Sequence, residues 1–217
     1  MSDAVPTPPA FAPSELAVLF GDRFAPEGGM LASKEEILTS GVKVNAEKLC
    51  SAAVQAALWA VHRSGVATLE LRQGKALFGL VKTQTLHVVR GSGAAVFPPH
   101  TLESVVVQAA QSGPAVQTLL EGYIGGEVAD PSARVLEAVK AGMAERGLLD
   151  REARRTMMVF TTVAFALPPA ARAAAERAGV DAVQALLRDA EQREPALFRA
   201  VQKDIDGARV TMTESRD

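Results

Sequence analysis

The three histidines are the residues whose side chains are best suited to bind a metal or to transfer protons. They are His62, His87 and His100, and gaps of 25 and 13 residues separate them. Zinc sites usually bring two ligands together within three to five residues, and this spacing is absent. His62 ends a predicted helix, where a histidine usually interacts with the helix dipole. The histidines therefore predict no metal site.

The single cysteine and the glycine-rich segments do not indicate catalysis either. Cys50 lies on the apolar stripe of a predicted helix, where a buried small hydrophobe is more usual than a nucleophile. Gly91-Ser92-Gly93 lacks the G-x-S-x-G spacing of a nucleophile elbow. Gly125-Gly126 is an isolated pair without the other residues of a phosphate-binding loop. We therefore expect a protein that is not an enzyme and that needs no cofactor.

A group of basic residues is the first feature that could bind a ligand. It comprises Arg134, Arg146, Arg151, Arg154 and Arg155, with Lys140 among them. Residues 132–155 hold six basic and four acidic residues, a net charge of 6 − 4 = +2. One interpretation is a solvated turn of mixed charge. The other is a small patch that binds phosphate groups or anionic lipid.

An apolar run, Thr156 to Leu167, follows these arginines directly. Its only polar residues are threonines, and it is longer than the usual strand of about five or six residues. We therefore predict a hairpin that turns near Thr161-Thr162. Its large side chains could form a buried core, or they could insert into an anionic membrane beside the arginines. The candidate insertion residues are Met157, Met158, Phe160 and Phe165.

A shorter apolar segment lies at the centre of an earlier predicted hairpin. Its residues are Leu77, Phe78, Leu80 and Val81. An exposed apolar patch of this kind is typical of a surface that pairs with another subunit. The segment therefore predicts a homo-oligomer.

Two similar units position these residues. Asn45 to Arg63 predicts an amphipathic helix that ends at Gly65. Residues 66–72 alternate as a half-buried strand does, and residues 83–90 are predicted to be the return strand. Ser132 to Arg146 predicts a second helix, with Gly147 before the apolar hairpin. A helix that ends at glycine and leads into a hairpin is typical of a winged helix. We therefore predict a mainly α (α+β) fold with two winged-helix-like units, residues 45–97 and 101–167.

The remaining segments predict further helices and two tails. Residues 101–111, 114–122, 170–178, 181–193 and 195–205 have helical patterns, and Ser33 to Glu36 resembles a capping box before a short helix that ends at Gly41. We expect one domain over residues 14–206. Proline-rich residues 1–13 and residues 207–217 are predicted to be disordered tails.

Composition limits the classes of partner and the location. The 217 residues carry a net charge of −2, so no overall positive field would attract nucleic acid. Residues 1–13 do not resemble a signal peptide, and no apolar stretch reaches the roughly 18 residues of a membrane-spanning helix. One cysteine suits a reducing compartment. We expect a cytoplasmic protein that can bind the inner surface of the membrane.

Several segments between Ser14 and Gly179 resemble the Golgi phosphoprotein 3 family and its bacterial relatives. These are residues 14–20, 52–71, 137–149 and 158–168. The resemblance implies a helical core, peripheral membrane binding and no catalysis. In the family, a tryptophan and several arginines hold a phosphorylated inositol headgroup, and an apolar loop enters the bilayer.

The apolar loop of the family corresponds to residues 157–167, but its headgroup residues do not carry over. Trp59 lies inside a predicted helix, away from the tryptophan position of the family. Ala133 and Leu136 occupy the arginine positions, with Arg134 one place away. The resemblance therefore implies a general anionic lipid or a protein partner.

Together these features predict a non-enzymatic cytoplasmic adaptor that binds an anionic membrane surface, a protein partner, or both. The alternatives are a tandem winged-helix regulator that binds nucleic acid and a scaffold that assembles through its hairpins. Nucleic acid is the weaker alternative, because each predicted recognition helix carries only a few basic or polar residues on its outer face.

Overall fold

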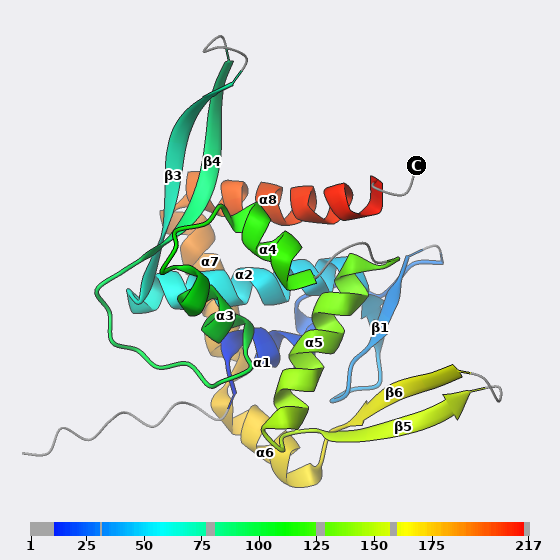
Figure 1. Cartoon of the computed structure of the whole chain (residues 1–217). Helices are drawn as coiled ribbons and strands as arrows, with labels where there is room; N and C mark the ends of the chain where they lie inside the picture. Colours follow the sequence, from blue (N-terminus) through cyan, green and yellow to red (C-terminus); the bar gives the residue numbers. More distant parts are fainter. Residues whose placement is uncertain (1–10, 31, 77–80, 125–128, 157–159, 215–217) are drawn as a thin grey trace, which may run out of the picture.

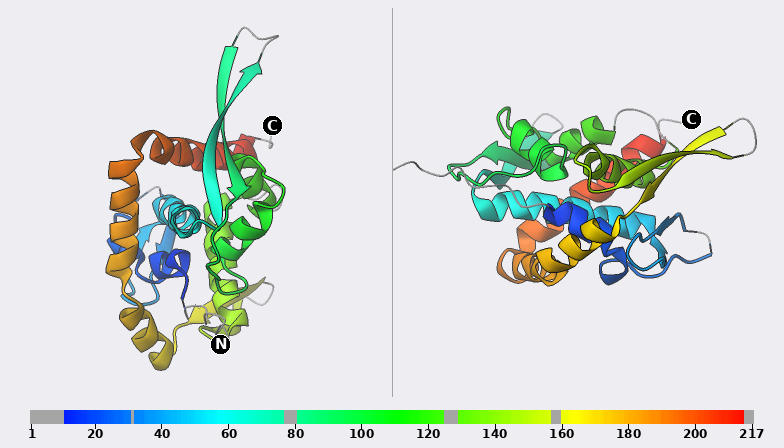
Figure 2. Two further views of the ribbon diagram at one scale, coloured as in Figure 1. Left: turned by 90° about the vertical axis from the view of Figure 1, so that its left-hand side faces the viewer. Right: turned by 90° about the horizontal axis from the view of Figure 1, so that it is seen from below.

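Helix α2 (Ala46–Ser64) is the centre of the fold. The structure is a computed structural model that describes residues 11–30, 32–76, 81–124, 129–156 and 160–214. Figure 2 shows α2 nearly end-on in its left view, with α5, α7 and α8 around it. Leu49, Leu58 and Trp59 are at most 1% exposed. A helix that is apolar on nearly all sides belongs in the core, and neighbouring helices cover α2 accordingly.

The ends of α2 follow from its sequence. The Asn45 side chain accepts a hydrogen bond from the Lys48 amide at 3.0 Å, and Gly65 ends the helix with a φ of 72°. The other helices are α1 (Pro13–Leu19), the 3-10 helix η1 (Gly21–Arg23), α3 (Leu102–Ala109), α4 (Val116–Ile124), α5 (Pro131–Glu145), α6 (Pro169–Ala178), α7 (Val180–Arg193) and α8 (Pro195–Glu214). The predicted mainly α (α+β) class is confirmed.

The described strands form three separate antiparallel pairs (Figure 1). They are β1 (Lys34–Glu36) with β2 (Lys43–Asn45), β3 (Ala67–Ala76) with β4 (Val81–Arg90), and β5 (Asp150–Thr156) with β6 (Phe160–Ala166). The second and third pairs each follow a helix, α2 and α5, as predicted. The helix proposed from the Ser33 capping box is wrong, because this segment pairs with β2 instead.

The β3–β4 hairpin extends from the helical body (Figure 1). Ala67 and Leu69 on β3 and Leu86 and Val88 on β4 are buried, whereas Leu71 is 37% exposed. The base of the hairpin therefore belongs to the core, and its outer part leaves it. Of the predicted pairing residues, Val81 begins β4 opposite Ala76; residues 77–80, with Leu77, Phe78 and Leu80, lie outside the described part of the chain.

The register of β5–β6 corrects the predicted turn. Thr161 pairs with Arg155 and Thr162 with Arg154, so both threonines lie within β6. The partner of the apolar strand is the charged segment Asp150–Thr156 rather than the first half of the apolar run. The link between the strands contains Met157 and Met158, which lie outside the described residues.

Both predicted tails are too long. Phe11 and Ala12 are 2% and 0% exposed, and α1 begins at Pro13. At the other end, α8 continues to Glu214 because Val201, Ile205 and Ala208 form a buried stripe at helical spacing. Arg209 also forms a salt bridge with Glu47 on α2. The C-terminal helix is therefore part of the core through residue 208.

Candidate functional site

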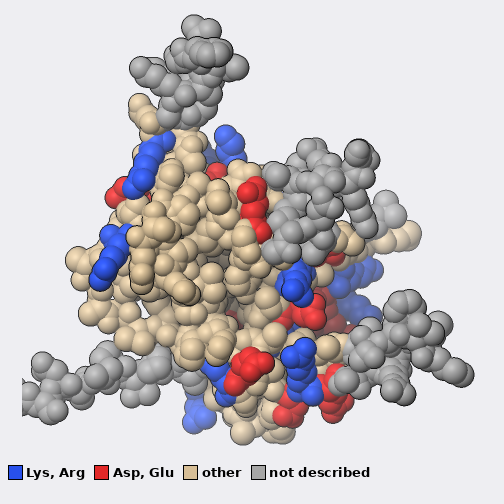
Figure 3. Space-filling view, in the orientation of Figure 1, with Lys and Arg blue, Asp and Glu red and all other residues tan. Residues whose placement is uncertain are grey.

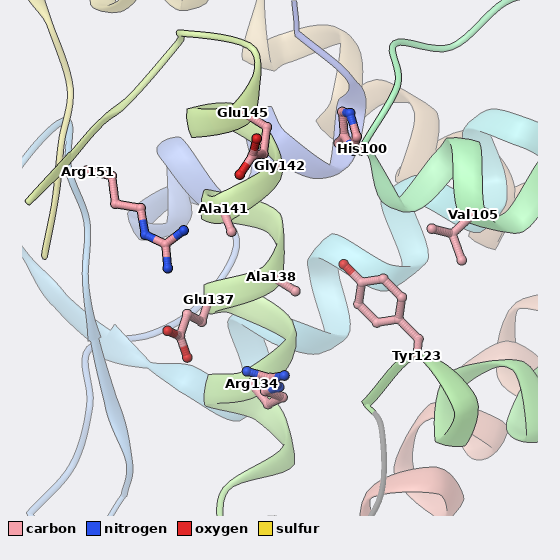
Figure 4. A pocket seen from close by; sticks show the side chains of 10 residues that line it. All are labelled: His100, Val105, Tyr123, Arg134, Glu137, Ala138, Ala141, Gly142, Glu145 and Arg151. Atoms are coloured by element: carbon pink, nitrogen blue, oxygen red, sulfur yellow. The ribbon is translucent and has the colours of Figure 1, made fainter. Parts of the chain in front are cut away.

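A pocket of about 380 Å³ lies between α4, α5 and the start of β5 (Figure 4). The α5 residues that line it recur at helical spacing on one face. Ala138 and Ala141 leave the space open because their side chains are small, whereas Gly142 lies close to the backbone of His100. The lining residues are His100, Val105, Tyr123, Arg134, Glu137, Ala138, Ala141, Gly142, Glu145 and Arg151. The pocket thus brings together two of the predicted anion-binding arginines.

Arg134 and Arg151 come from different elements, α5 and β5. Neither forms a salt bridge within the described part of the chain, so both guanidinium groups can bind a ligand. Glu137 and Glu145 line the same pocket and balance their charge, 2 − 2 = 0. The pocket therefore has no strong local field, and its two guanidinium groups are hydrogen-bond donors.

Tyr123 adds a neutral donor to this pocket. Figure 4 shows its side chain directed from α4 towards α5. Burial, together with the negative charge of Glu103, raises the pKa of Tyr123 to about 12. The hydroxyl therefore stays protonated at neutral pH and can donate to a phosphate or carboxylate oxygen.

The other predicted site residues have separate positions. Arg154 and Arg155 lie farther along β5, opposite Thr162 and Thr161, and Phe160 begins β6 opposite Thr156.

Phe165 was predicted to insert into a membrane, but it lies near the base of the hairpin, opposite Arg151. It is half-buried, packs against the core, and has the Lys140 Nζ atom 5.5 Å from its ring centroid. It therefore serves to attach the hairpin to the body.

Arg146 was predicted to bind an external anion, and this is wrong. Its guanidinium group donates to Glu15 Oε1, and the Glu15 side chain is fully buried. Glu15 Oε2 accepts a hydrogen bond from the Ala12 amide at 2.9 Å. Burial is the largest influence on the pKa of Glu15 and raises it, although Ala12 and Arg146 act in the opposite direction. Arg146 compensates an internal charge and joins α5 to α1.

A second buried carboxylate, Glu103, lies close to this pair. It accepts hydrogen bonds from the Ser14 amide at 2.8 Å and the Ser14 hydroxyl at 2.7 Å. Complete burial raises the pKa of Glu103 to about 7. Neither carboxylate was predicted from the sequence. Their positions within apolar segments, next to Leu16 and Leu102, were a signal that could have identified them.

Protonation of Glu103 predicts that stability decreases as pH rises. Between pH 4.5, the ordinary pKa of a glutamate, and about pH 7, the Glu103 carboxyl keeps its proton in the folded protein. In the unfolded chain, the same carboxyl has lost its proton over this pH range. The stabilisation is complete below pH 4.5 and is lost as pH rises through about 7, with a limit of about 3 kcal/mol. Urea unfolding at pH 5 and pH 8 measures this difference. Glu103→Gln should reduce it, whereas exposed Glu176→Gln should not; an increase in stability from pH 5 to pH 8 contradicts the assignment.

Within the described residues, no group of three potential ligands has metal-binding geometry. Among the described helices, none combines the length and the apolar character of a membrane span. In comparisons with known proteins, no family model, curated protein or solved structure matches this chain. The resemblance to the Golgi phosphoprotein 3 family stays a prediction.

Proposed function

We propose that this chain is a non-enzymatic adaptor that binds an anionic membrane surface through the β5–β6 hairpin. The observation that carries the proposal is the separation of charge along this hairpin. Its acidic residues, Asp150 and Glu152, lie in the half of β5 nearest α5. Arg154 and Arg155 lie in the outer half, and no acidic residue occurs between residues 153 and 166. The outer hairpin thus combines positive charge with an apolar sequence.

This combination matches the two contributions that peripheral membrane binding requires. A basic residue near an anionic surface contributes about 1 kcal/mol, so two arginines alone give weak attachment. Apolar residues that enter the interface add the remainder. Figure 1 supports the geometry, because β5 and β6 extend away from the helices. Arg134 and Arg151 in the pocket at the base could then bind a lipid phosphate or an acidic side chain of a protein partner.

The charge distribution elsewhere favours this local site. On the face drawn in Figure 3, basic and acidic side chains lie among a larger uncharged surface, and most basic groups have an acidic group nearby. The net charge of −2 likewise provides no long-range attraction to a membrane. Binding should therefore depend on the hairpin arginines, and it should weaken as added salt screens them. A cytoplasmic location is part of this proposal, because anionic lipids are concentrated in the leaflet that faces the cytoplasm.

Arg154→Glu/Arg155→Glu should abolish binding to anionic vesicles. Loss of two basic residues costs about 2 kcal/mol, or roughly thirtyfold in affinity, and the added negative charges increase the loss. Co-sedimentation with phosphatidylcholine vesicles, with and without phosphatidylserine, measures the effect.

Arg199→Glu/Arg193→Glu is the matched control, because it makes the same charge change at exposed positions on α8 and α7. The control should bind as the wild type does. If the wild type does not co-sediment with anionic vesicles, or if both double variants lose binding equally, the hairpin is not a membrane-binding element. A protein partner would then be the remaining form of the adaptor proposal.

A further inference from the structure

A second pocket, separate from the proposed membrane site, lies between α2, α7 and α8. Its volume is about 300 Å³, at the lower end of the range for small-molecule sites. Phe24, Leu187 and Phe198 provide apolar walls from three separate parts of the chain. The polar and charged lining residues are Lys48, Ser51, Gln55, Arg188, Glu191 and Gln202. The pocket thus combines an apolar interior with charged groups.

Ser51 provides the observation that points to a ligand. This residue is 5% exposed, and its Oγ atom has no hydrogen-bond partner among the described residues. A serine inside a helix usually bonds to the carbonyl four residues earlier or reaches solvent. A buried hydroxyl without a partner is unfavourable, so native proteins rarely retain one without a reason. A polar ligand atom in the pocket would satisfy the Ser51 hydroxyl.

Gln55 adds a second polar group one turn along α2. Its side chain is 6% exposed, and its Nε2 atom donates to Gln202 Oε1 on α8. Gln202 in turn donates to Asp206 at 3.0 Å. This chain of amides fixes the orientation of Gln55 and leaves its Oε1 atom as an acceptor. Ser51 and Gln55 therefore provide a fixed polar region within an otherwise apolar site.

The charges select the class of ligand. Lys48 on α2 and Arg188 on α7 are exposed, and neither forms a salt bridge in the described part of the chain. In contrast, Arg63 and Arg193 near the same helices pair with Asp189. Glu191 offsets one of the two free cations, which leaves a net charge of 2 − 1 = +1 at the pocket. The excess favours a monoanion.

We propose that this pocket binds a small organic carboxylate with an apolar body, such as an aryl-substituted short-chain acid. The carboxylate contacts Lys48 and Arg188, and the apolar body lies between Phe24, Leu187 and Phe198. The hydroxyl of Ser51 forms its missing hydrogen bond with a polar atom of the ligand. This function is independent of the β5–β6 hairpin.

Fluorescence of Trp59 provides the readout, because it is the only tryptophan in the chain. Its ring stacks on Phe198 with centroids 6.1 Å apart, so occupancy of the pocket changes its surroundings. Titration with 3-phenylpropionate should give a saturable signal. The neutral 3-phenylpropanamide should bind about tenfold more weakly, because it lacks the charge that Lys48 and Arg188 recognise. Absence of saturable binding by 3-phenylpropionate overturns the proposal.

Three variants locate the binding site. Arg188→Ala should weaken 3-phenylpropionate binding about tenfold, and Ala52→Leu should abolish it by filling the pocket. Arg199→Ala removes an exposed arginine that lines a different pocket, so it should bind as the wild type does. Thermal unfolding by circular dichroism confirms that each variant is folded. If folded Ala52→Leu and Arg188→Ala both titrate as the wild type does, the ligand binds elsewhere and the assignment is wrong.

Discussion

Arg146→Met is expected to lower the free energy of unfolding by about 3–5 kcal/mol, because it leaves a buried carboxylate without its cation. Glu15 is 0% exposed, and the side chain of Arg146 is 12% exposed. Water therefore cannot replace the guanidinium group, and the amide of Ala12 is the remaining charge-stabilising donor shown for Glu15. Urea denaturation at neutral pH, with a linear extrapolation to water, measures the change.

A double variant separates the buried charge from the packing of the arginine side chain. Glu15→Gln/Arg146→Met removes both charges, so it should be more stable than Arg146→Met alone. Exposed Arg151→Met should stay within about 0.5 kcal/mol of the wild type. A loss below about 1 kcal/mol for Arg146→Met would show that Glu15 is protonated or hydrated without the arginine. The same outcome would support the original prediction that Arg146 binds an external anion.

Most of the helices and the two strands of the first hairpin could be predicted because their signals are local, whereas the turn expected at Gln73-Gly74 was wrong, because both residues pair within β3. In α2, an apolar stripe, an Asn45 cap and a terminal glycine agree with one another, and Gly65 has the positive φ expected at a helix end. Gly147 has the same φ of 72° after α5. Alternation of apolar and polar residues in β3 identified a half-buried strand, and Leu69 and Leu71 show how burial decreases outward.

The second hairpin was misread because β5 has no apolar alternation. Its residues from Asp150 to Arg155 are mostly charged, so the pattern resembled a solvated turn. A strand in a hairpin that projects from the body needs no buried face, and β5 is held by backbone pairing with β6. The apolar run was therefore predicted to contain both strands, with a turn at Thr161-Thr162, although these residues lie within β6.

The sites themselves depend on contacts between distant residues. Arg146 and Glu15 are 131 positions apart, and the bond between Gln55 and Gln202 spans 147. Spacing within one segment cannot reveal such pairs. The isolated glutamate at position 15, within an apolar segment, was a signal for a buried partner of opposite charge, but it was not used. The sequence does not show that Arg146 is this partner, because the pair depends on the packing of α5 against α1.

Gly142→Ala should be strongly destabilising, by about 3 kcal/mol or more, because no space exists for a methyl group. A Cβ atom at this position would lie 2.0 Å from the His100 carbonyl oxygen. His100 itself has a φ of 60°, an uncommon value for a residue other than glycine. The loop is therefore already constrained where it meets α5. To admit the methyl group, either the helix or the loop backbone must shift, which would also deform the pocket around Tyr123 and Arg134.

Gly122→Ala is the matched control, because Gly122 is also helical and a Cβ atom there meets nothing within 4 Å. Alanine should stabilise α4 by about 0.5–1 kcal/mol, since it reduces the conformational entropy of the unfolded chain. The two substitutions thus make the same chemical change with opposite expected signs. Thermal and urea unfolding measure both. A Gly142→Ala variant as stable as the wild type would mean that the His100 loop can move from α5 without cost, and the pocket between α4 and α5 would not be a preformed site.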